Sequence, residues 1–281
     1  MSKTAVLLTH SHPPGAADAV GAACRLAAEA GWDLVATPDE REKHGGGVEI
    51  REVPELPERP DLCLVLGGDG TILRALRVFG KTRVPVFAVN YGTMGFLAAV
   101  EREEAEEGLS RAFAGDYEVI DLPGLGIDWN GNSALGLNDV SFSRRPHGRV
   151  AELSYRIGDQ EVGHVRCDGL VAATPVGSTG YNLANSGPIL AWGVEGYVVS
   201  YIAPHSLTAR ALVVAPGDVL EVGNAAGRDA VDVAVDGAPV GALEPGGWVE
   251  INFRDGAGCL AQLPGASFYR RIREKFGHLA V

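Results

Sequence analysis

The sequence predicts a parallel α/β domain followed by a mostly antiparallel β domain. Up to about Tyr117, short apolar runs alternate with helix-like segments, a pattern typical of βαβ units. From Val119 to Phe253 the pattern changes to short apolar or alternating runs separated by Gly, Asp, Asn and Pro, which favours an antiparallel β domain. Glycine supplies 38 of the 281 residues, against a usual share of about 7%, so many tight turns and ligand-approaching loops are expected.

Apolar runs and breaker residues predict the elements of the α/β domain in order. The first helix is expected to end at Gly31. The carboxylates at the start of the helix expected from Glu101 suit a helix N-terminus better than a metal site. Strands are expected at Thr4–Thr9, Leu34–Ala36, Leu62–Leu66 and Val84–Asn90, helices at Ala16–Ala30, Ile72–Phe79 and from Glu101, and a loop or linker at Gly45–Gly47, Pro54, Pro57 and Pro60.

Shorter runs make up the β domain. Asp236-Gly237 lies between two of them and is interpreted as a hairpin turn, for which Asp-Gly is a strong local signal. Another run carries Arg166 and Asp168 on either side of Cys167, so the two charged side chains are expected on one face of a strand. The runs are Ala134–Phe142, Val150–Ile157, Val162–Ala173, Ala211–Val214, Val231–Val235 and Trp248–Phe253, and a closing helix is expected at Ser267–Phe276.

The composition excludes several classes of protein. A net charge of −12 argues against general nucleic-acid binding, which favours basic surfaces. The four cysteines are scattered without a C-x-x-C pair, so free thiols in a reducing cytoplasm are expected rather than a zinc site or a disulfide framework. No run approaches the roughly 20 apolar residues that span a bilayer, and Ala5–Leu8 is too short for a signal peptide. We expect a soluble, cytoplasmic protein without a membrane partner.

The most informative segment is the loop Gly67-Gly68-Asp69-Gly70-Thr71, which follows an apolar strand and precedes a helix. This order places backbone N–H groups around an anion, and glycine lets the backbone approach a phosphate closely. A carboxylate repels such a ligand, so Asp69 is interpreted as a base or a metal partner. The alternative is a plain strand-to-helix turn in which Asp69 is the N-cap.

A second loop rich in glycine and hydroxyl groups follows another strand, and residues 168–182 read DGLVAATPVGSTGYN. Together with the loop at 67–71, Asn138-Asp139 and the block Pro204–Leu207, it resembles the NAD kinase family, and the resemblance extends from Leu62 to the C-terminus. The Gly-Gly-Asp-Gly loop is shared with diacylglycerol-type lipid kinases and phosphofructokinases, whereas the second block is much more specific.

The resemblance implies a fold and an activity. It implies an α/β domain with a Rossmann-like parallel sheet at 1–118, a β-rich dinucleotide-binding domain at 119–260, and a C-terminal segment at 261–281 whose helix returns to the first domain. The implied reaction transfers a phosphoryl group from ATP to the 2′-hydroxyl of the adenosine ribose of NAD, giving NADP, in a homodimer or homotetramer. Mg²⁺ or another divalent cation is expected with ATP, while polyphosphate as donor and NADH as acceptor are left open. A lipid or sugar kinase sharing the loop and a non-catalytic dinucleotide-binding sensor are the alternatives.

The first loop is expected to serve the phosphates and the chemistry. Asp69 is expected to accept the hydroxyl proton as general base and to contact NAD together with Gly70. No residue is assigned to a metal, because the histidines lack metal-ligand spacing. The donor phosphates are assigned to Gly67, Gly68, Gly70 and Thr71, with Arg74 on the following helix.

The resemblance implies NAD-binding residues in the β domain, at the positions that match the family's pattern. Asn138 and Asp139 are expected at the adenosine end, although an ordinary turn is the more common explanation of these residue types alone. Arg166 and Asp168 are expected at the nicotinamide end, with a simple salt bridge between them as the alternative. The remaining assigned residues are Arg149, from the basic cluster at 144–149, and Thr179, Gly180, Tyr181, Asn182 and Ala184.

The chain also departs from the family's pattern. Val176 replaces a Thr or Ser, Gly180 replaces an Ala, and Ala184 opens a tripeptide where the family more often has Ser-Ala-Gly. Ala238 replaces the Gln that often follows Asp236-Gly237, so this turn is left out of the expected site. The block Pro204–Arg210 is expected to support the substrate loop. Because the assigned residues come from both domains, the ligand is expected in the cleft between them.

Overall fold

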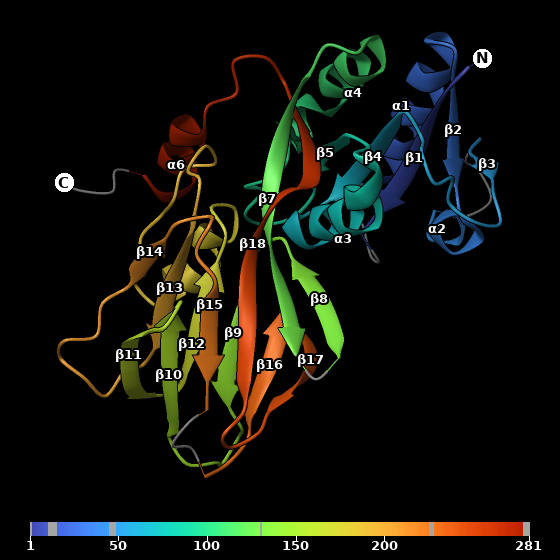
Figure 1. Ribbon diagram of the computed structural model, residues 1–281. Helices are drawn as coiled ribbons and strands as arrows, with labels where there is room; N and C mark the ends of the chain where they lie inside the picture. Colours follow the sequence, from blue (N-terminus) through green and yellow to red (C-terminus); the bar gives the residue numbers. More distant parts are fainter. Residues whose placement is uncertain (1, 11–15, 45–48, 130, 225–227, 278–281) are drawn as a thin grey trace. The chain divides into compact units, whose positions relative to one another are not determined.

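The computed structural model describes residues 2–10, 16–44, 49–129, 131–224 and 228–277. The loop expected around Gly45–Gly47 therefore lies mostly outside the described residues. The chain divides into two compact units, here called unit 1 and unit 2 (Figure 1). Unit 1 consists of Met1–Asp121 with Gly256–Val281, and unit 2 of Leu122–Asp255. Within the described ranges, no helix is both long enough and apolar enough to cross a bilayer.

Unit 1 is built on a parallel sheet. Its strands are ordered β3-β2-β1-β4-β5, and the C-terminal end of β18 continues the sheet beside β5. All these pairs are parallel. β4 is buried along its whole length, as expected for a parallel strand covered on both faces. The strands are β1 (Lys3–Thr9), β2 (Trp32–Ala36), β3 (Arg51–Glu52), β4 (Leu62–Gly67), β5 (Val86–Asn90), β6 (Val100–Glu101) and β18 (Trp248–Gln262).

The three longest helices of unit 1, α1, α3 and α4, each bury one apolar side. In α1, alanine and valine recur three and four residues apart, which gives an apolar stripe. These residues share a core with α4 and with side chains of the sheet. Burial of this apolar area is the main stabilising term of the unit. The helices are α1 (Ala16–Glu29), α2 (Pro38–Glu42), α3 (Asp69–Phe79), α4 (Ala105–Ala114) and α6 (Phe268–Phe276).

The C-terminal helix α6 belongs to unit 1, as the fold prediction expects. The ring of Phe276 lies 5.2 Å from that of Phe96, and Lys275 forms an ion pair with Glu101 at 2.7 Å. Ser267 caps the helix, since its side chain accepts a hydrogen bond from the N–H of Arg270. Helix α6 thus packs against the first unit, although the 134 residues of unit 2 (122–255) intervene in the sequence.

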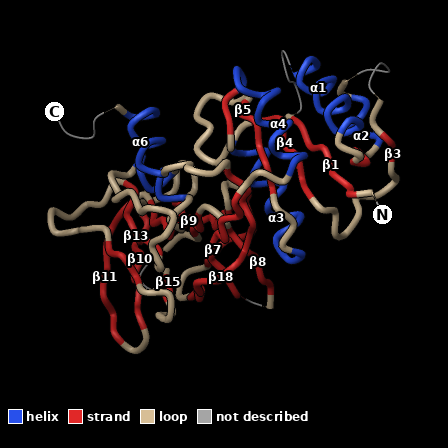
Figure 2. The backbone as a smooth tube through the Cα atoms, turned by 90° about the horizontal axis from the view of Figure 1, so that it is seen from above, coloured by secondary structure: helices blue, strands red, loops and turns tan. Residues whose placement is uncertain are grey.

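Unit 2 contains antiparallel strands in two layers. One layer has the order β14-β13-β12-β9-β16-β17, and the other contains β11-β10-β15 and the first part of β18. Side chains from both layers form one apolar core. Figure 2 shows strands and connections dominating this unit, whereas helices and strands alternate in unit 1. The strands not yet given are β7 (Glu118–Trp129), β8 (Asn132–Gly136), β9 (Asp139–Arg144), β10 (Ala151–Ile157), β11 (Gln160–Cys167), β12 (Gly169–Ala173), β13 (Tyr197–Ile202), β14 (Leu212–Val214), β15 (Leu220–Gly223), β16 (Val231–Val235) and β17 (Ala238–Leu243).

Two of the runs expected in the β domain are each divided between two strands. The run 162–173 changes layer at Asp168, because β11 pairs with β10 while β12 pairs with β9 and β13. Asp168 is therefore a corner residue, and the expectation that it shares one strand with Arg166 is wrong. The run 134–142 is likewise broken at Leu137 and Asn138, between β8 and β9. A continuous apolar run does not reveal a change of partner, since both strands face the same core.

Candidate functional site

The loop after β4 fixes Asp69 at the first position of α3. The N-cap of α3 is Gly68, without a side-chain cap, so the interpretation of Asp69 as an N-cap is wrong. Its carboxylate instead accepts hydrogen bonds from the backbone N–H groups of Phe96 at 3.1 Å and Leu97 at 3.0 Å. An ionised carboxylate has about four acceptor positions, so two N–H donors fix its orientation and leave capacity for a substrate hydroxyl.

Close contacts explain the first two glycines of this loop. A Cβ on Gly67 would lie 2.7 Å from Oγ1 of Thr71, and a Cβ on Gly68 would lie 3.1 Å from the Cα of Gly92. Gly92 needs the same space from the other side, because its own Cβ would lie 2.7 Å from the Cα of Gly68. Gly70, in contrast, is exposed with nothing near its missing Cβ. Sequence reasoning recognised the first loop but missed Gly92.

An open pocket of about 560 Å³ lies over the loop and exposes Asp69. The pocket lies entirely within unit 1 and combines hydroxyl, backbone and basic groups around this carboxylate. Thr71 is buried and Arg74 is exposed on the next turn of α3. The residues that line it are Thr9, His10, Gly68, Asp69, Gly70, Thr71, Arg74, Tyr91, Gly92, Thr93 and Met94.

A buried carboxylate beside this pocket was missed by sequence reasoning. Glu40 of α2 is 4% exposed and accepts hydrogen bonds from the N–H of Thr9 at 2.6 Å and from Lys43 Nζ at 2.8 Å. A guanidinium nitrogen of Arg74 lies 3.3 Å from the same carboxylate. Burial lowers the pKa of the nearby His44 below its ordinary value. Glu40 thus pairs with Arg74, which lines the pocket, but in the sequence Glu40 is one of several charged residues in a short helix.

In unit 2, the expected adenosine-binding pair lies in a loop organised by Asp236. The carboxylate of Asp236 accepts hydrogen bonds from the N–H groups of Leu137 at 3.0 Å, Asn138 at 2.6 Å and Asp139 at 3.2 Å. Asp236 and Gly237 both have positive φ, 47° and 74°, which identifies the expected hairpin turn between β16 and β17. The turn therefore does more than reverse the chain, which the sequence signal did not reveal.

Asn138 and Asp139, the two residues of this loop that are expected to bind NAD, differ in their surroundings. Oδ1 of Asn138 is buried and has no hydrogen-bond partner among the described residues. Asp139 is 6% exposed, and burial, followed by the negative charge of Asp236, raises its pKa to about 7. A buried acceptor without a partner is uncommon in folded proteins, and a carboxyl group that titrates near neutral pH is frequent at functional sites.

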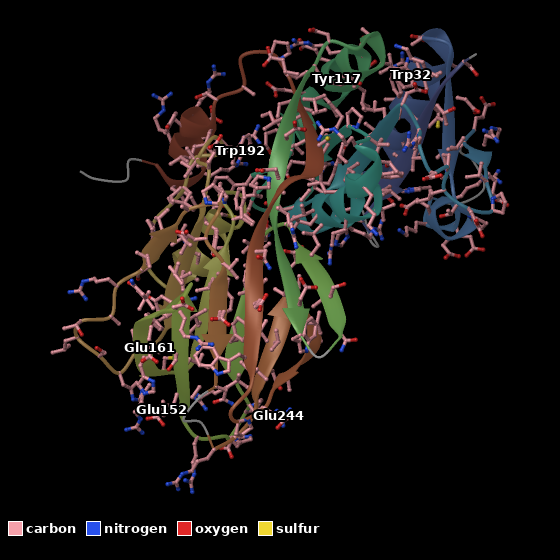
Figure 3. All side chains as sticks on the ribbon, in the orientation of Figure 1. Trp32, Tyr117, Glu152, Glu161, Trp192 and Glu244 are labelled. Carbon is pink, nitrogen blue, oxygen red and sulfur yellow. The ribbon has the colours of Figure 1, made fainter. Side chains whose placement is uncertain are left out.

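Arg166 and Asp168 do not form a salt bridge with each other. Asp168 pairs with Arg144 at 2.6 Å, and Arg166 lies 3.9 Å from Glu152 of β10, the residue marked in Figure 3. The reason is that Asp168 lies at the corner where the chain leaves β11, so its neighbours are on β9, whereas those of Arg166 are on β10.

The sequence indicates Arg144 only as part of a basic cluster, in which Arg149 is the preferred candidate. Arg149 is exposed, and its N–H donates to Asp229 at 3.1 Å.

Hydroxyl and amide side chains hold the second loop together from inside. Thr174 donates to the carbonyl of Leu137 at 2.6 Å and so joins this loop to the Asn138 loop. Asn182 is fully buried, and its Nδ2 donates to the carbonyls of Ser178 and Pro188, both at 2.9 Å. The more accessible positions of this loop are Thr179, Gly180, Tyr181 and Ala184, all of them among the expected NAD-binding residues.

The fold and the loop define a class before any comparison with relatives. A parallel α/β unit with a carboxylate in a glycine-rich loop, joined to an antiparallel β unit, is the arrangement expected of a small-molecule kinase with a Gly-Gly-Asp-Gly loop. Models of the ATP-NAD kinase N-terminal domain and of the ATP-NAD kinase C-terminal domain match residues 33–117 and 137–256. The chain belongs to the NAD kinase family.

Individual relatives agree with this assignment. The NAD kinase of Carboxydothermus hydrogenoformans is 34% identical over 235 residues, which cover 82% of this chain and 84% of the relative. That of Burkholderia pseudomallei is 31% identical over 278 residues, covering 97% and 92%.

Two solved structures are similar in fold. The structure of yeast NADH kinase complexed with NADH has a TM-score of 0.86 at 22% identity. The match covers 100% of this chain and 89% of the yeast chain. An NAD kinase from Archaeoglobus fulgidus in complex with ATP has a TM-score of 0.72 at 22% identity and covers 98% of each chain.

Proposed function

We propose that this chain is an ATP-dependent NAD kinase that phosphorylates the 2′-hydroxyl of the adenosine ribose of NAD. Family membership supports the reaction, and one observation supports the location of its chemistry. Asp69 is exposed to an open pocket at a glycine-rich loop, and its carboxylate is oriented by two backbone N–H groups. A general base must lie within hydrogen-bond reach of the proton that it accepts, and a fixed carboxylate in an accessible pocket meets this requirement.

In the proposed reaction, the carboxylate of Asp69 accepts the proton of the 2′-hydroxyl as that oxygen bonds to the γ-phosphorus of ATP. The bond between the γ-phosphorus and the bridging oxygen breaks, and ADP leaves with the electron pair. The loop at 67–71 would cradle the donor phosphates with its N–H groups, and Arg74 would face their charge. Catalysis of this kind depends mostly on positioning and on charge stabilisation.

Mg²⁺ or another divalent cation is proposed to accompany ATP. Among the described residues, no group of three His, Cys, Asp or Glu side chains is placed to hold a metal ion, so a cation carried by the phosphates fits the residues present better than a dedicated protein cage. Bound there, the cation would neutralise charge on the phosphoryl group. Asp69 is the one carboxylate in the sequence of the loop at 67–71.

For NAD, we propose that Asn138 and Asp139 contact the adenosine end. The unpartnered Oδ1 of Asn138 would accept a hydrogen bond from the ligand, which removes the cost of a buried acceptor. Arg166 and Asp168 are proposed at the nicotinamide end, where Arg144 holds the carboxylate of Asp168. The other proposed NAD contacts are Asp69, Gly70, Arg149, Thr179, Gly180, Tyr181, Asn182 and Ala184. Of these, Asn182 is fully buried; its Nδ2 is already hydrogen-bonded within the loop, whereas its Oδ1 has no hydrogen-bond partner among the described residues.

A homodimer or homotetramer, a cytoplasmic location, and the use of polyphosphate as an alternative donor complete the proposal. The oligomeric state and the alternative donor rest on the sequence resemblance, and the location rests on the composition of the sequence.

One assay separates the proposed activity from its alternatives. The purified protein is incubated with NAD, ATP and Mg²⁺, and NADP is measured by an NADP-specific dehydrogenase. We expect NADP formation with the wild-type chain and loss of it with Asp69→Asn. Phosphate on diacylglycerol or a sugar without NADP would indicate the lipid or sugar kinase. Tight NAD binding without transfer would indicate a sensor.

A further inference from the structure

We propose that Arg271 of α6 and Gln262 at the end of β18 are positioning residues for Asp69. They act through the backbone of Phe96 and Leu97, the two residues whose N–H groups bind the Asp69 carboxylate. The inference rests on the proposed role of Asp69 as the base. It assigns to the C-terminal helix a part in the reaction that its sequence does not suggest.

The backbone of Phe96 and Leu97 is held from both sides, through its N–H groups and through its carbonyl groups. Their N–H groups donate to Asp69 at 3.1 and 3.0 Å. On the other side, the carbonyl of Phe96 accepts a hydrogen bond from the guanidinium of Arg271, and that of Leu97 accepts one from Nε2 of Gln262 at 2.9 Å. Arg271 also donates to Oε1 of Gln262 at 2.9 Å. The five residues form a connected network within unit 1.

The chemistry of the two outer side chains suits this role. The planar guanidinium of Arg271 presents donors in a fixed geometry, so it can bind one carbonyl and one amide oxygen at the same time. Gln262 is 1% exposed, and its side-chain amide donates to the carbonyl of Leu97 and accepts from Arg271. Burial lowers the pKa of Arg271, while the carboxylates of Asp69, Glu101 and Glu274 oppose the shift.

The helix has other attachments, so loss of the Arg271 contacts should not detach it. The rings of Phe276 and Phe96 pack together, and Lys275 pairs with Glu101. Ile272 is buried under the same helix. A purely structural role for Arg271 would therefore predict a loss of stability without a selective effect on the chemical step. A positioning role predicts a lower kcat at nearly unchanged substrate affinity.

The test uses Arg271→Met, which removes both donor interactions. We expect kcat to fall about 10- to 100-fold because a misplaced base costs rate, while KM for NAD and for ATP stays within about threefold. Arg271→Lys retains the charge but can satisfy only part of the network, so its kcat should be intermediate. Arg273→Gln removes a positive charge from the exposed side of the same helix and serves as the matched control, with kcat unchanged.

A second variant addresses the other half of the network. Gln262→Glu keeps an acceptor for Arg271 but loses the donor to the carbonyl of Leu97, and a drop in kcat is expected here too. Amide hydrogen exchange at Phe96 and Leu97 supplies a readout independent of activity, and it should become faster in both variants than in wild type. Wild-type kcat and unchanged exchange in Arg271→Met and Gln262→Glu would overturn the inference. Absence of NADP formation by the wild-type chain would overturn the proposed function instead, while the exchange data would still decide whether the network holds these amides.

Discussion

Asp69 in unit 1 and Asp236 in unit 2 each accept hydrogen bonds from two or more backbone N–H groups, and the two carboxylates have different roles. In unit 1, Asp69 is the proposed reacting group, and the N–H groups of Phe96 and Leu97 orient it. In unit 2, Asp236 does not belong to the expected site, and it orients the loop that carries Asn138 and Asp139. In unit 1 the N–H groups orient the carboxylate, whereas in unit 2 the carboxylate orients the N–H groups and the loop that carries them.

The electrostatic surroundings of the two sites also differ. Asp69 shares its pocket with Arg74, and Arg271 lies behind its supporting loop. Asp139, in contrast, is buried beside a second acid, Asp236, and its pKa is raised to about 7. An apolar and negative environment favours the neutral acid over the carboxylate. Stability should therefore depend on pH through Asp139, and substitutions at the two sites should have different effects.

The largest expected effect is that of Asp69→Asn. The amide keeps the shape and one acceptor oxygen but cannot take up a proton, so kcat should fall by about 10²–10⁴-fold. Binding of NAD, measured by calorimetry, should stay nearly unchanged. Asp121→Asn, an exposed acid of the same unit paired with Arg83, is the control. A kcat near that of wild type in Asp69→Asn would show that Asp69 is not the general base, so the proposed difference between Asp69 and Asp236 would fail.

The next effect is a pH-dependent stability caused by Asp139. Because its pKa in the folded protein is about 7, against an ordinary value of 3.8, the folded state binds this proton more tightly than the unfolded chain. The contribution is fully present below pH 4 and is lost as the pH rises through about 7. The free energy of unfolding of Asp139→Asn minus that of wild type should thus increase over this interval, by about 2–4 kcal/mol. Urea unfolding of both proteins from pH 4.5 to 8.5, within the range over which both stay folded, measures it, and a flat difference would contradict the burial effect.

Asn138 and Asp168 test the assignment of the two ends of NAD. Asn138→Ala should lower kcat/KM for NAD by about 10- to 100-fold, with effects on both KM and kcat, because it loosens the reacting hydroxyl. Asp168→Ala should act mainly on KM, by about 10-fold or less, because the nicotinamide end is remote from the chemistry. Steady-state kinetics of the two variants under identical conditions give the contrast. A collapse of kcat confined to Asp168→Ala would reverse the assignment.

The smallest effect is expected for Asp236→Asn, which tests the second half of the comparison. Asn tolerates the positive φ at this turn and keeps one acceptor, so the loop should be loosened but not lost. KM for NAD should rise about 3- to 10-fold at nearly constant kcat, in line with the loss of about 1 kcal/mol of hydrogen bonding. Asp159→Asn changes an exposed acid in another hairpin and should leave KM unchanged. Equal kinetics for the two variants would show that Asp236 acts as a turn residue only.

Much of the fold could be predicted from the sequence because its signals are local. The apolar run of β4, the glycines after it and the start of α3 are contiguous, and each specifies its own backbone conformation. The change from alternating helices and strands to strands alone is also visible along the chain. The same holds for the second glycine-rich loop, whose residues made the family recognisable. Sequence by itself thus determined the fold class, the family and the position of Asp69.

The tertiary structure alone decided which distant residues support these positions. Phe96, Leu97, Gln262 and Arg271 gather behind Asp69, although Arg271 and Phe96 are 175 residues apart in the chain. The three N–H groups held by Asp236 lie 97 to 99 residues from it. Asp168 pairs with Arg144 rather than Arg166 because the chain changes layer at that corner. Such partners depend on which segments the topology brings together, and a hydrogen bond between distant residues leaves no periodicity or spacing in the sequence through which it could be predicted.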